Sequence, residues 1–304
     1  MDNIKEDEFH KKNLFELQKL NIEELSKYYS ELRKYEFENK VPLKSIEIRK
    51  KIHSILVSIV KFDRLLSKES INIINDERIN TNNPKIYACT HIGGNDVQRA
   101  FEAIQEPAYL FLGDPKGIYK DVSGLLLFLN GVICLETCDK QDRMIAKLRA
   151  IELLESGGNL LIYPEGAWNI TPSLPVMNLY RGTVDIAKQT GADLIPMGIE
   201  QYEKNFYISI GKNIVTKDLK NINNIELNQI LRDAMATEKW RIFESQGVYQ
   251  RSKIKNITID QYQQFIVSKC KYDFTVQDVY NTMYHDFSNP SPDEVFQYQK
   301  KLVR

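Results

Sequence analysis

The chain has 304 residues, and its 41 Lys and Arg residues balance its 41 Asp and Glu residues to a formal net charge of zero. That length allows one sizeable core with additions, and the charge balance argues against nucleic acid as a bulk electrostatic partner. The four cysteines lack the spacing of a disulfide framework, which indicates a reducing compartment.

Residues 1–80 are heavily charged and carry apolar residues at helical spacing, which predicts a helical N-terminal extension. Its second helix, over residues 46–66, combines an apolar stripe with basic residues (Arg49, Lys50, Lys51, Lys61 and Arg64). Such a helix can lie on an anionic membrane surface; we favour the alternative, packing on the rest of the chain with the basic face in water. No stretch approaches the roughly 20 apolar residues that span a bilayer, and the first residues contain no apolar signal region.

The next stretch predicts a strand, a tight turn and a helix in succession. The apolar strand covers residues 85–90, and the helix, over residues 96–106, repeats its apolar residues at spacings of three and four. The turn between them begins at His91 and ends at Asp96, with two glycines inside it. Open α/β sheets usually bind ligands at such strand-to-helix junctions.

His91 and Asp96 are a candidate catalytic pair. Neutral imidazole can take a proton from a hydroxyl near pH 7, and a carboxylate can fix the tautomer of the ring. The alternative is a chance spacing, with Asp96 favoured in the first helical turn by the helix dipole. Cys89 lies two residues before His91, and we interpret it as a small buried residue rather than a nucleophile paired with the histidine.

A second motif follows an apolar strand predicted over residues 159–163, which ends abruptly at Pro164, Glu165 and Gly166. Proline cannot donate to a sheet ladder and glycine permits unusual dihedral angles, so the chain turns sharply there. The turn presents Glu165 at the carboxyl end of its strand, on the side where His91 is expected.

The elements around these motifs alternate between strands and helices. Further strands are predicted near 108–112, 132–135, 194–198 and 206–210, and further helices near 121–130, 140–156 and 182–190. This alternation predicts an α/β fold with a central, mostly parallel sheet flanked by helices. Residues 216–304 are polar and mostly helical, with helices expected near 227–240 and 262–266; they could shape a pocket, dock a partner or cover the sheet.

The order of the motifs resembles the lysophospholipid or glycerolipid acyltransferases of the PlsC type. The resemblance rests on His-x4-Asp, a Gly-x-Ile strand at Gly131, Pro-Glu-Gly, a basic residue before glycine and a proline-bearing strand, and it covers roughly residues 84–215. It implies transfer of a fatty acyl group from acyl-CoA or acyl carrier protein to a glycerolipid hydroxyl, without a metal or other cofactor. By position it makes His91 the general base and Asp96 its orienting acid.

The resemblance also makes Glu165 and Gly166 substrate-binding, because they match the start of the Glu-Gly-Thr-Arg block of the family. This chain has Trp168 where the family has arginine. A guanidinium grips phosphate through a planar, bidentate fork that an indole cannot imitate. Trp168 instead offers a flat apolar or sugar-stacking face, or it is a packed core residue. Two arginines elsewhere, Arg181 and Arg143, could supply the missing charge.

Acyl transfer generates an oxyanion that needs hydrogen-bond donors. The backbone amides of Gly93 and Gly94 are candidates, because they lie in a turn near a helix start. The alternative reason for these two glycines is that the loop needs positive φ at both positions, and both reasons can hold together.

The sequence therefore predicts an O-acyltransferase that acts on lysophosphatidic acid or a related glycerolipid. Its catalytic domain would cover residues 81–215, between helical extensions at 1–80 and 216–304. Two alternatives stay open: an acceptor hydroxyl on a sugar or other cell-envelope precursor, and a non-catalytic lipid- or partner-binding protein on the same scaffold. The expected location is the cytoplasm of a bacterium, or the cytoplasmic membrane face if residues 46–66 bind there.

Overall fold

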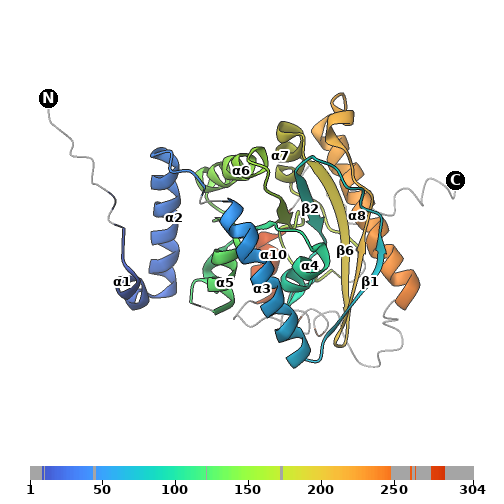
Figure 1. Cartoon of the computed structure of the whole chain (residues 1–304), viewed down its shortest axis with the longest axis horizontal. Coiled ribbons are helices and arrows are strands. Elements are labelled where there is room, and N and C mark those ends of the chain that lie inside the picture. The colour runs from blue at the N-terminus through green and yellow to red at the C-terminus, as the bar shows by residue number, and fades with distance from the viewer. Residues whose placement is uncertain are drawn as a thin grey trace. The chain divides into compact units, whose positions relative to one another are not determined.

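The computed structural model describes residues 9, 11–43, 46–120, 122–171, 174–247, 261, 264 and 275–284. Hydrogen bonds join seven strands into one sheet in the order β1-β7-β6-β2-β5-β3-β4 (Figure 1). The strands are β1 (Ser70–Asp76), β2 (Lys85–Cys89), β3 (Tyr109–Gly113), β4 (Val132–Leu135), β5 (Leu160–Ile162), β6 (Asp193–Tyr202) and β7 (Asn205–Ile210). β1 pairs with β7, β2 with β6 and β3 with β4 in parallel, whereas β6 and β7 are antiparallel. The mostly parallel sheet confirms the predicted fold class.

The helices are α1 (Leu14–Lys19), α2 (Ile22–Glu38), α3 (Ile46–Leu66), α4 (Asp96–Ile104), α5 (Val122–Asn130), α6 (Lys140–Glu155), α7 (Gly182–Thr190), α8 (Asn224–Gln246) and α10 (Val276–Thr282). All strands and helices predicted between β2 and β7 are present, with small shifts at their ends. Of the helix expected near 262–266, only residue 264 is described, and the rest of it lies outside the described residues. Among the described helices, none combines the length and apolarity that crossing a membrane requires.

β1 is the strand that sequence analysis missed, because it lies inside the segment 1–80 where only helices were predicted. Its seven residues, Ser-Ile-Asn-Ile-Ile-Asn-Asp, contain no continuous apolar run, and none of them is fully buried. β1 stands at one end of the strand order, where a strand needs to pair on one side only.

The described chain forms two compact units. The first contains Met1–Leu56 and Pro107–Leu160, and the second contains Val57–Glu106 and Leu161–Arg304. The predicted division into 1–80, 81–215 and 216–304 concerns function rather than compactness, and it stays a prediction. His91, Asp96 and Glu165 all belong to the second unit.

The core of the second unit is built on β2, which is buried at all five positions. Such a continuous apolar run is typical of a strand covered on both faces. α8 packs on β6 and β7. A Cβ at Gly198 of β6 would lie 2.7 Å from the backbone of Glu238, so only glycine allows α8 to approach this closely.

In the first unit, α2 packs on α6 through a buried ion pair. Arg33 donates to both carboxylate oxygens of Asp142, at 3.0 and 2.5 Å, and Asp142 also accepts the backbone N–H of Glu136 at 2.8 Å. Asp142 is fully buried. Its three donors compensate for the loss of water around the charge.

Replacing Asp142 by Ala is expected to lower the free energy of unfolding by about 3 kcal/mol, because the Arg33 guanidinium loses its bidentate partner and keeps only Glu136 at 3.6 Å and the Tyr119 hydroxyl at 3.3 Å. Urea unfolding followed by circular dichroism would measure the change. Asp139→Ala is the matched control, since Asp139 is only half-buried, caps α6 and binds Lys34 near the surface. Equal losses from the two substitutions would contradict a special role for the buried pair.

Candidate active site

The turn that follows β2 brings His91 and Asp96 together. Gly93 and Gly94 both have positive φ, 81° and 67°, so the backbone folds back between the two residues. Asp96 is the first residue of α4 and is fully buried, while the His91 side chain keeps 17% of its surface exposed. The imidazole therefore stands between a buried carboxylate and the surface.

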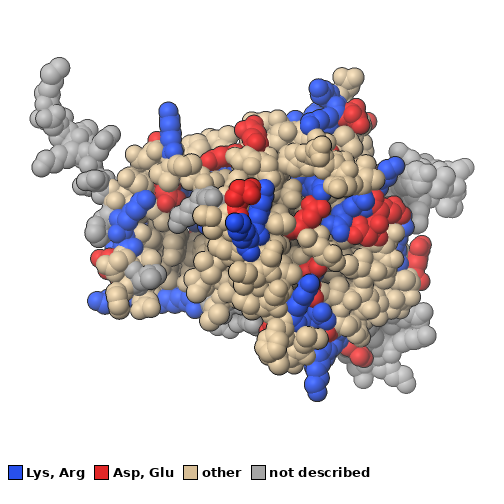
Figure 2. Space-filling model, in the orientation of Figure 1, with Lys and Arg blue, Asp and Glu red and all other residues tan. Residues whose placement is uncertain are grey.

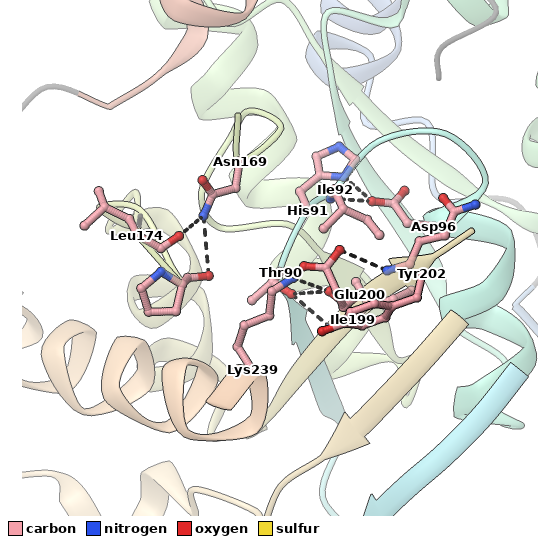
Figure 3. A network of polar contacts seen from close by, with 12 residues as sticks. Thr90, His91, Ile92, Asp96, Asn169, Leu174, Ile199, Glu200, Tyr202 and Lys239 are labelled. Carbon is pink, nitrogen blue, oxygen red and sulfur yellow. Dashed lines mark hydrogen bonds and ion pairs between the residues drawn. The ribbon is translucent and has the colours of Figure 1, made fainter. Parts of the chain in front are cut away.

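His91 and Asp96 are joined through Nδ1 of the imidazole, which lies 2.7 Å from Oδ2 of the carboxylate (Figure 3). A carboxylate only accepts, so Nδ1 donates and the lone pair of the neutral ring lies on Nε2. The same Oδ2 accepts the backbone N–H groups of Ile92 and Gly93 at 2.8 and 2.9 Å. These bonds fix Asp96 independently of the imidazole, and Nε2 is the atom that could take a proton.

Glu165 reaches the same turn, but not the imidazole. Its Oε1 accepts the backbone N–H of His91 at 3.0 Å, and its Oε2 accepts the N–H of Met177 at 2.8 Å and Nδ2 of Asn169 at 3.3 Å. The side chain is fully buried. The structure thus places the Glu165 carboxylate on the backbone that carries His91, and its predicted role in substrate binding stays a prediction.

The charge state of Glu165 reflects this position. Burial raises the pKa of the carboxyl, and the N–H donors of Met177 and His91 lower it. Lys239 of α8, which pairs with Glu200 at 3.0 Å (Figure 3), also lowers it. Burial is the larger effect, so the pKa of the Glu165 carboxyl lies above its ordinary value.

Asn169 is a residue of the candidate site that the sequence analysis did not single out. Its backbone N–H donates to the carbonyl of His91 at 2.8 Å, so both backbone polar groups of His91 are held by the segment after β5. Its side chain donates to the carbonyl of Leu174 at 2.9 Å (Figure 3) and accepts the N–H of Thr171 at 3.1 Å. An asparagine that binds the backbone two residues on is a turn signal that the sequence contained.

Tyr163 forms an apolar wall beside the base and was also missed. The centroid of its ring lies 4.2 Å from that of His91, and the residue is buried. Its hydroxyl has no hydrogen-bond partner among the described residues. Burial, followed by the charge of Asp96, raises the pKa of the phenol well above its ordinary value, so Tyr163 stays neutral beside the imidazole.

Cys89 is not a nucleophile in this arrangement. It is fully buried in β2, and burial together with the nearby carboxylate of Asp96 raises the pKa of its thiol well above the ordinary value. A thiol rather than a thiolate is a poor nucleophile. The interpretation of Cys89 as a buried small residue agrees with this environment.

The expected oxyanion donors need a correction at Gly93. Its N–H is donated to Asp96, so it is not available to a substrate. Gly94 follows it in the same turn, is only half-buried, and keeps the proposed role.

Gly166 and Trp168 have different roles. Gly166 has φ of 69°, and a Cβ there would lie 2.3 Å from the ring of Tyr180, so the position needs glycine for steric reasons. The Trp168 ring centroid lies 6.2 Å from that of His91 at an interplanar angle of 77°. A Cβ at Gly93 would be 3.5 Å from the indole, so this ring packs on the turn that carries the base.

Neither candidate arginine is bonded to the pair. Arg181 is exposed before α7 and makes no hydrogen bond or ion pair with His91, Asp96 or Glu165 in the described structure. Arg143 belongs to the first unit, where its guanidinium donates to the carbonyl of Thr137. The structure brings Trp168, rather than an arginine, to the imidazole.

Comparisons with known proteins agree with the geometry. Residues 70–200 match the family model described as Acyltransferase, and this stretch contains His91, Asp96 and Glu165. The fold is similar to the crystal structure of the 1-acyl-sn-glycerophosphate (LPA) acyltransferase PlsC from Thermotoga maritima, with a TM-score of 0.54 and 14% sequence identity, covering 71% of this chain and 88% of that chain. No curated protein matches the sequence significantly.

The two positive comparisons support different conclusions. At 14% identity the likeness to PlsC concerns the fold, whereas the family model matches the sequence itself across both motifs. The resemblance expected from the order of the motifs is confirmed. Residues 70–200 of this chain thus match the Acyltransferase family model, and the fold around them is similar to that of PlsC.

Proposed function

We propose that the chain transfers an acyl group from an acyl thioester, acyl-CoA or acyl carrier protein, to a hydroxyl of a glycerolipid acceptor such as lysophosphatidic acid. Nε2 of His91 takes the proton of the hydroxyl as its oxygen attacks the thioester carbonyl. The new C–O bond forms, the C–S bond breaks, and the thiolate leaves with the proton returned from the imidazolium. The observation that supports this mechanism best is the Nδ1 contact to buried Asp96, which leaves Nε2 as the base.

Asp96 would act without contact to the substrate. Its carboxylate lies 2.7 Å from Nδ1, where it stabilises the imidazolium formed during proton transfer. The amide of Gly94 is the proposed donor to the oxyanion. The acyltransferase PlsC, with its similar fold, is named for 1-acyl-sn-glycerophosphate, which supports a glycerolipid acceptor here.

A second acceptor class has a specific observation in its favour. Trp168 packs beside His91 at the position where the family has its arginine, and it brings a flat apolar face instead of a cation. A sugar or other neutral cell-envelope precursor could place its hydroxyl beside that face, and no charged group of the acceptor would have to be buried there. This alternative keeps the chemistry of His91 and changes only the acceptor.

An acceptor panel tests the proposed function. Purified protein would be incubated with labelled acyl-CoA or acyl carrier protein and with lysophosphatidic acid, neutral monoacylglycerol or glycan acceptors. Transfer to lysophosphatidic acid supports the first acceptor, and transfer only to neutral or glycan hydroxyls supports the second. Absence of transfer and of thioester hydrolysis under all conditions would contradict both and favour the non-catalytic alternative.

Contact with a membrane surface is part of the proposal, and α3 would provide it. Six large apolar side chains on α3 are exposed, Leu65 among them. The other five follow one another at spacings of seven, four, three and four residues, which places them on one face (Ile48, Ile55, Ile59, Phe62 and Leu66). Figure 2 shows a largely uncharged surface over the middle of this helix. Two of its basic side chains are engaged internally, since Arg64 binds Glu102 at 2.8 Å and Arg49 binds the carbonyl of Phe128. The exposed face is therefore mainly apolar, with the exposed Lys51 at helical spacing from Ile48 and Ile55.

The full-length chain is expected to float with anionic vesicles, and the double substitution of Ile55 and Ile59 by Glu is expected to abolish flotation. Two charges on the apolar face would have to enter the membrane interface unpaired. Ile225→Glu is the matched control, because Ile225 is an exposed isoleucine on α8 outside the proposed surface. Flotation of the double variant, or failure of the unmodified chain to float, would exclude α3 as the contact.

A further inference from the structure

Near the end of the described chain, residues 275–284 contain the short helix α10, which has its own N-terminal cap. Thr275 and Asp278 cap the N-terminus of α10 reciprocally, with the Asp278 carboxylate accepting the N–H of Thr275 at 2.8 Å and the Thr275 hydroxyl accepting the N–H of Asp278 at 3.1 Å. The inward side chains follow one another at helical spacing (Val276, Val279, Tyr280 and Met283). Val279 is only 5% exposed, so this face is packed rather than solvated.

The partner of that face is the segment that follows Glu165. Val279 forms one buried cluster with Ala167, Ile170 and Met177, and Trp168 packs against the cluster. Trp168 therefore packs both against the cluster that contains Val279 of α10 and against the turn of the catalytic base. All of these residues belong to the second unit.

A second contact joins α10 to the same segment. Tyr180 covers Gly166, where an added Cβ would meet its ring, and its hydroxyl donates to the carbonyl of Thr282 at 2.9 Å. The ring of Tyr180 also lies 5.1 Å from that of Tyr284. The residues around α10 thus hold the Glu-Gly-Ala-Trp segment at both Gly166 and Trp168.

We propose that α10 is an acceptor-specificity element, which positions the Trp168 indole beside His91 and selects hydroxyl acceptors with a neutral, flat or apolar group next to the reacting oxygen. The inference rests on the proposed acyl transfer and favours the second acceptor class, the neutral one, over lysophosphatidic acid. Trp168 is the specificity-determining residue, and Val279 and Met283 act through it. The indole face that would meet the acceptor is thus held in place by α10. This helix is distant in sequence from both the His-x4-Asp and the Pro-Glu-Gly motif.

Tryptophan fluorescence can report this contact separately from activity, because the chain contains only Trp168 and Trp240. Trp240 is 45% exposed on α8, so Trp240→Phe yields a protein in which emission comes from Trp168 alone. In that background Val279→Glu would place a charge in the apolar cluster and displace α10. Gln277→Ala is the matched control, since Gln277 is exposed on α10 and, among the described residues, donates to Asn281.

Val279→Glu is expected to shift the Trp168 emission to longer wavelength. It should also raise the KM for the preferred acceptor about tenfold, equal to a loss of about 1.4 kcal/mol of binding, while the KM for the thioester stays unchanged. Gln277→Ala should change none of these quantities. If Val279→Glu does not yield folded protein, Val279→Ala and Met283→Ala test the same shifts at smaller amplitude.

An unchanged emission in the folded Val279 variants would overturn the contact between α10 and Trp168. A shifted emission with an unchanged acceptor KM and unchanged acceptor preference would overturn the role in specificity. If the unmodified chain transfers acyl groups to no acceptor, the proposed function fails and the specificity proposal with it. If the unmodified chain is active and the Val279 variants leave the acceptor KM unchanged, the role of α10 is refuted while the proposed function stands.

Discussion

Replacing His91 by Ala is expected to slow acyl transfer by about 10²- to 10⁴-fold while the protein stays folded. The rate falls because the acceptor hydroxyl loses the base that removes its proton. The fold should persist because the contacts that order the turn do not use the imidazole: the His91 N–H binds Glu165, its carbonyl accepts from Asn169, and Asp96 keeps the amides of Ile92 and Gly93. Steady-state transfer and thermal unfolding, measured on the same preparation, would check both statements.

Asp96→Asn is the informative companion of His91→Ala. An asparagine oxygen can still accept the backbone amides of the turn, but the negative charge beside the imidazolium is lost. We therefore expect a smaller loss of rate than for His91→Ala, with the same folded turn. Near-normal turnover by the folded His91→Ala protein would remove His91 from the mechanism.

The sequence predicted the central part of the fold well because its elements carry strong local signals. β2 and β5 are short apolar runs that end at glycine or proline, and α4 and α6 follow with helical periodicity. β1 lacks such a signal, because its apolar and polar residues do not separate cleanly onto two faces. An edge strand of this kind is defined by its partner β7, which no local pattern reveals.

The candidate site was predictable only in part. The spacing of His91 and Asp96 fits a tight turn with two glycines, so the direct contact between them was expected from sequence. Glu165 was expected near His91, but its contact with the backbone N–H of His91 was not expected. A carboxylate can bind a substrate or a backbone N–H, and the sequence does not show how deeply the side chain is buried. The buried cluster that joins α10 to the segment around Trp168 brings together positions over 100 residues apart, and no local pattern could predict it.

Glu165→Gln is expected to slow acyl transfer by about 10²-fold, although Glu165 touches no substrate in the proposed mechanism. Both of its carboxylate oxygens accept backbone N–H groups, one from His91 and one from Met177. A glutamine has one oxygen, so its NH₂ group must face one of these donors. The segment after β5 and the turn of His91 would then separate, and a displacement of about 1 Å at the base suffices for such a loss.

The effect of Glu165 should be local, which separates positioning from a general loss of stability. Amide hydrogen exchange is expected to accelerate at His91 and Met177 in Glu165→Gln, while amides in β2 and β6 keep their wild-type protection. Glu165→Asp should restore part of the rate, because it keeps two accepting oxygens on a shorter side chain. Glu244→Gln, the same change at an exposed position of α8, is the control that should leave the rate unaltered. Full activity of Glu165→Gln, or exchange that rises equally throughout the second unit, would show that this carboxylate does not hold the base in place.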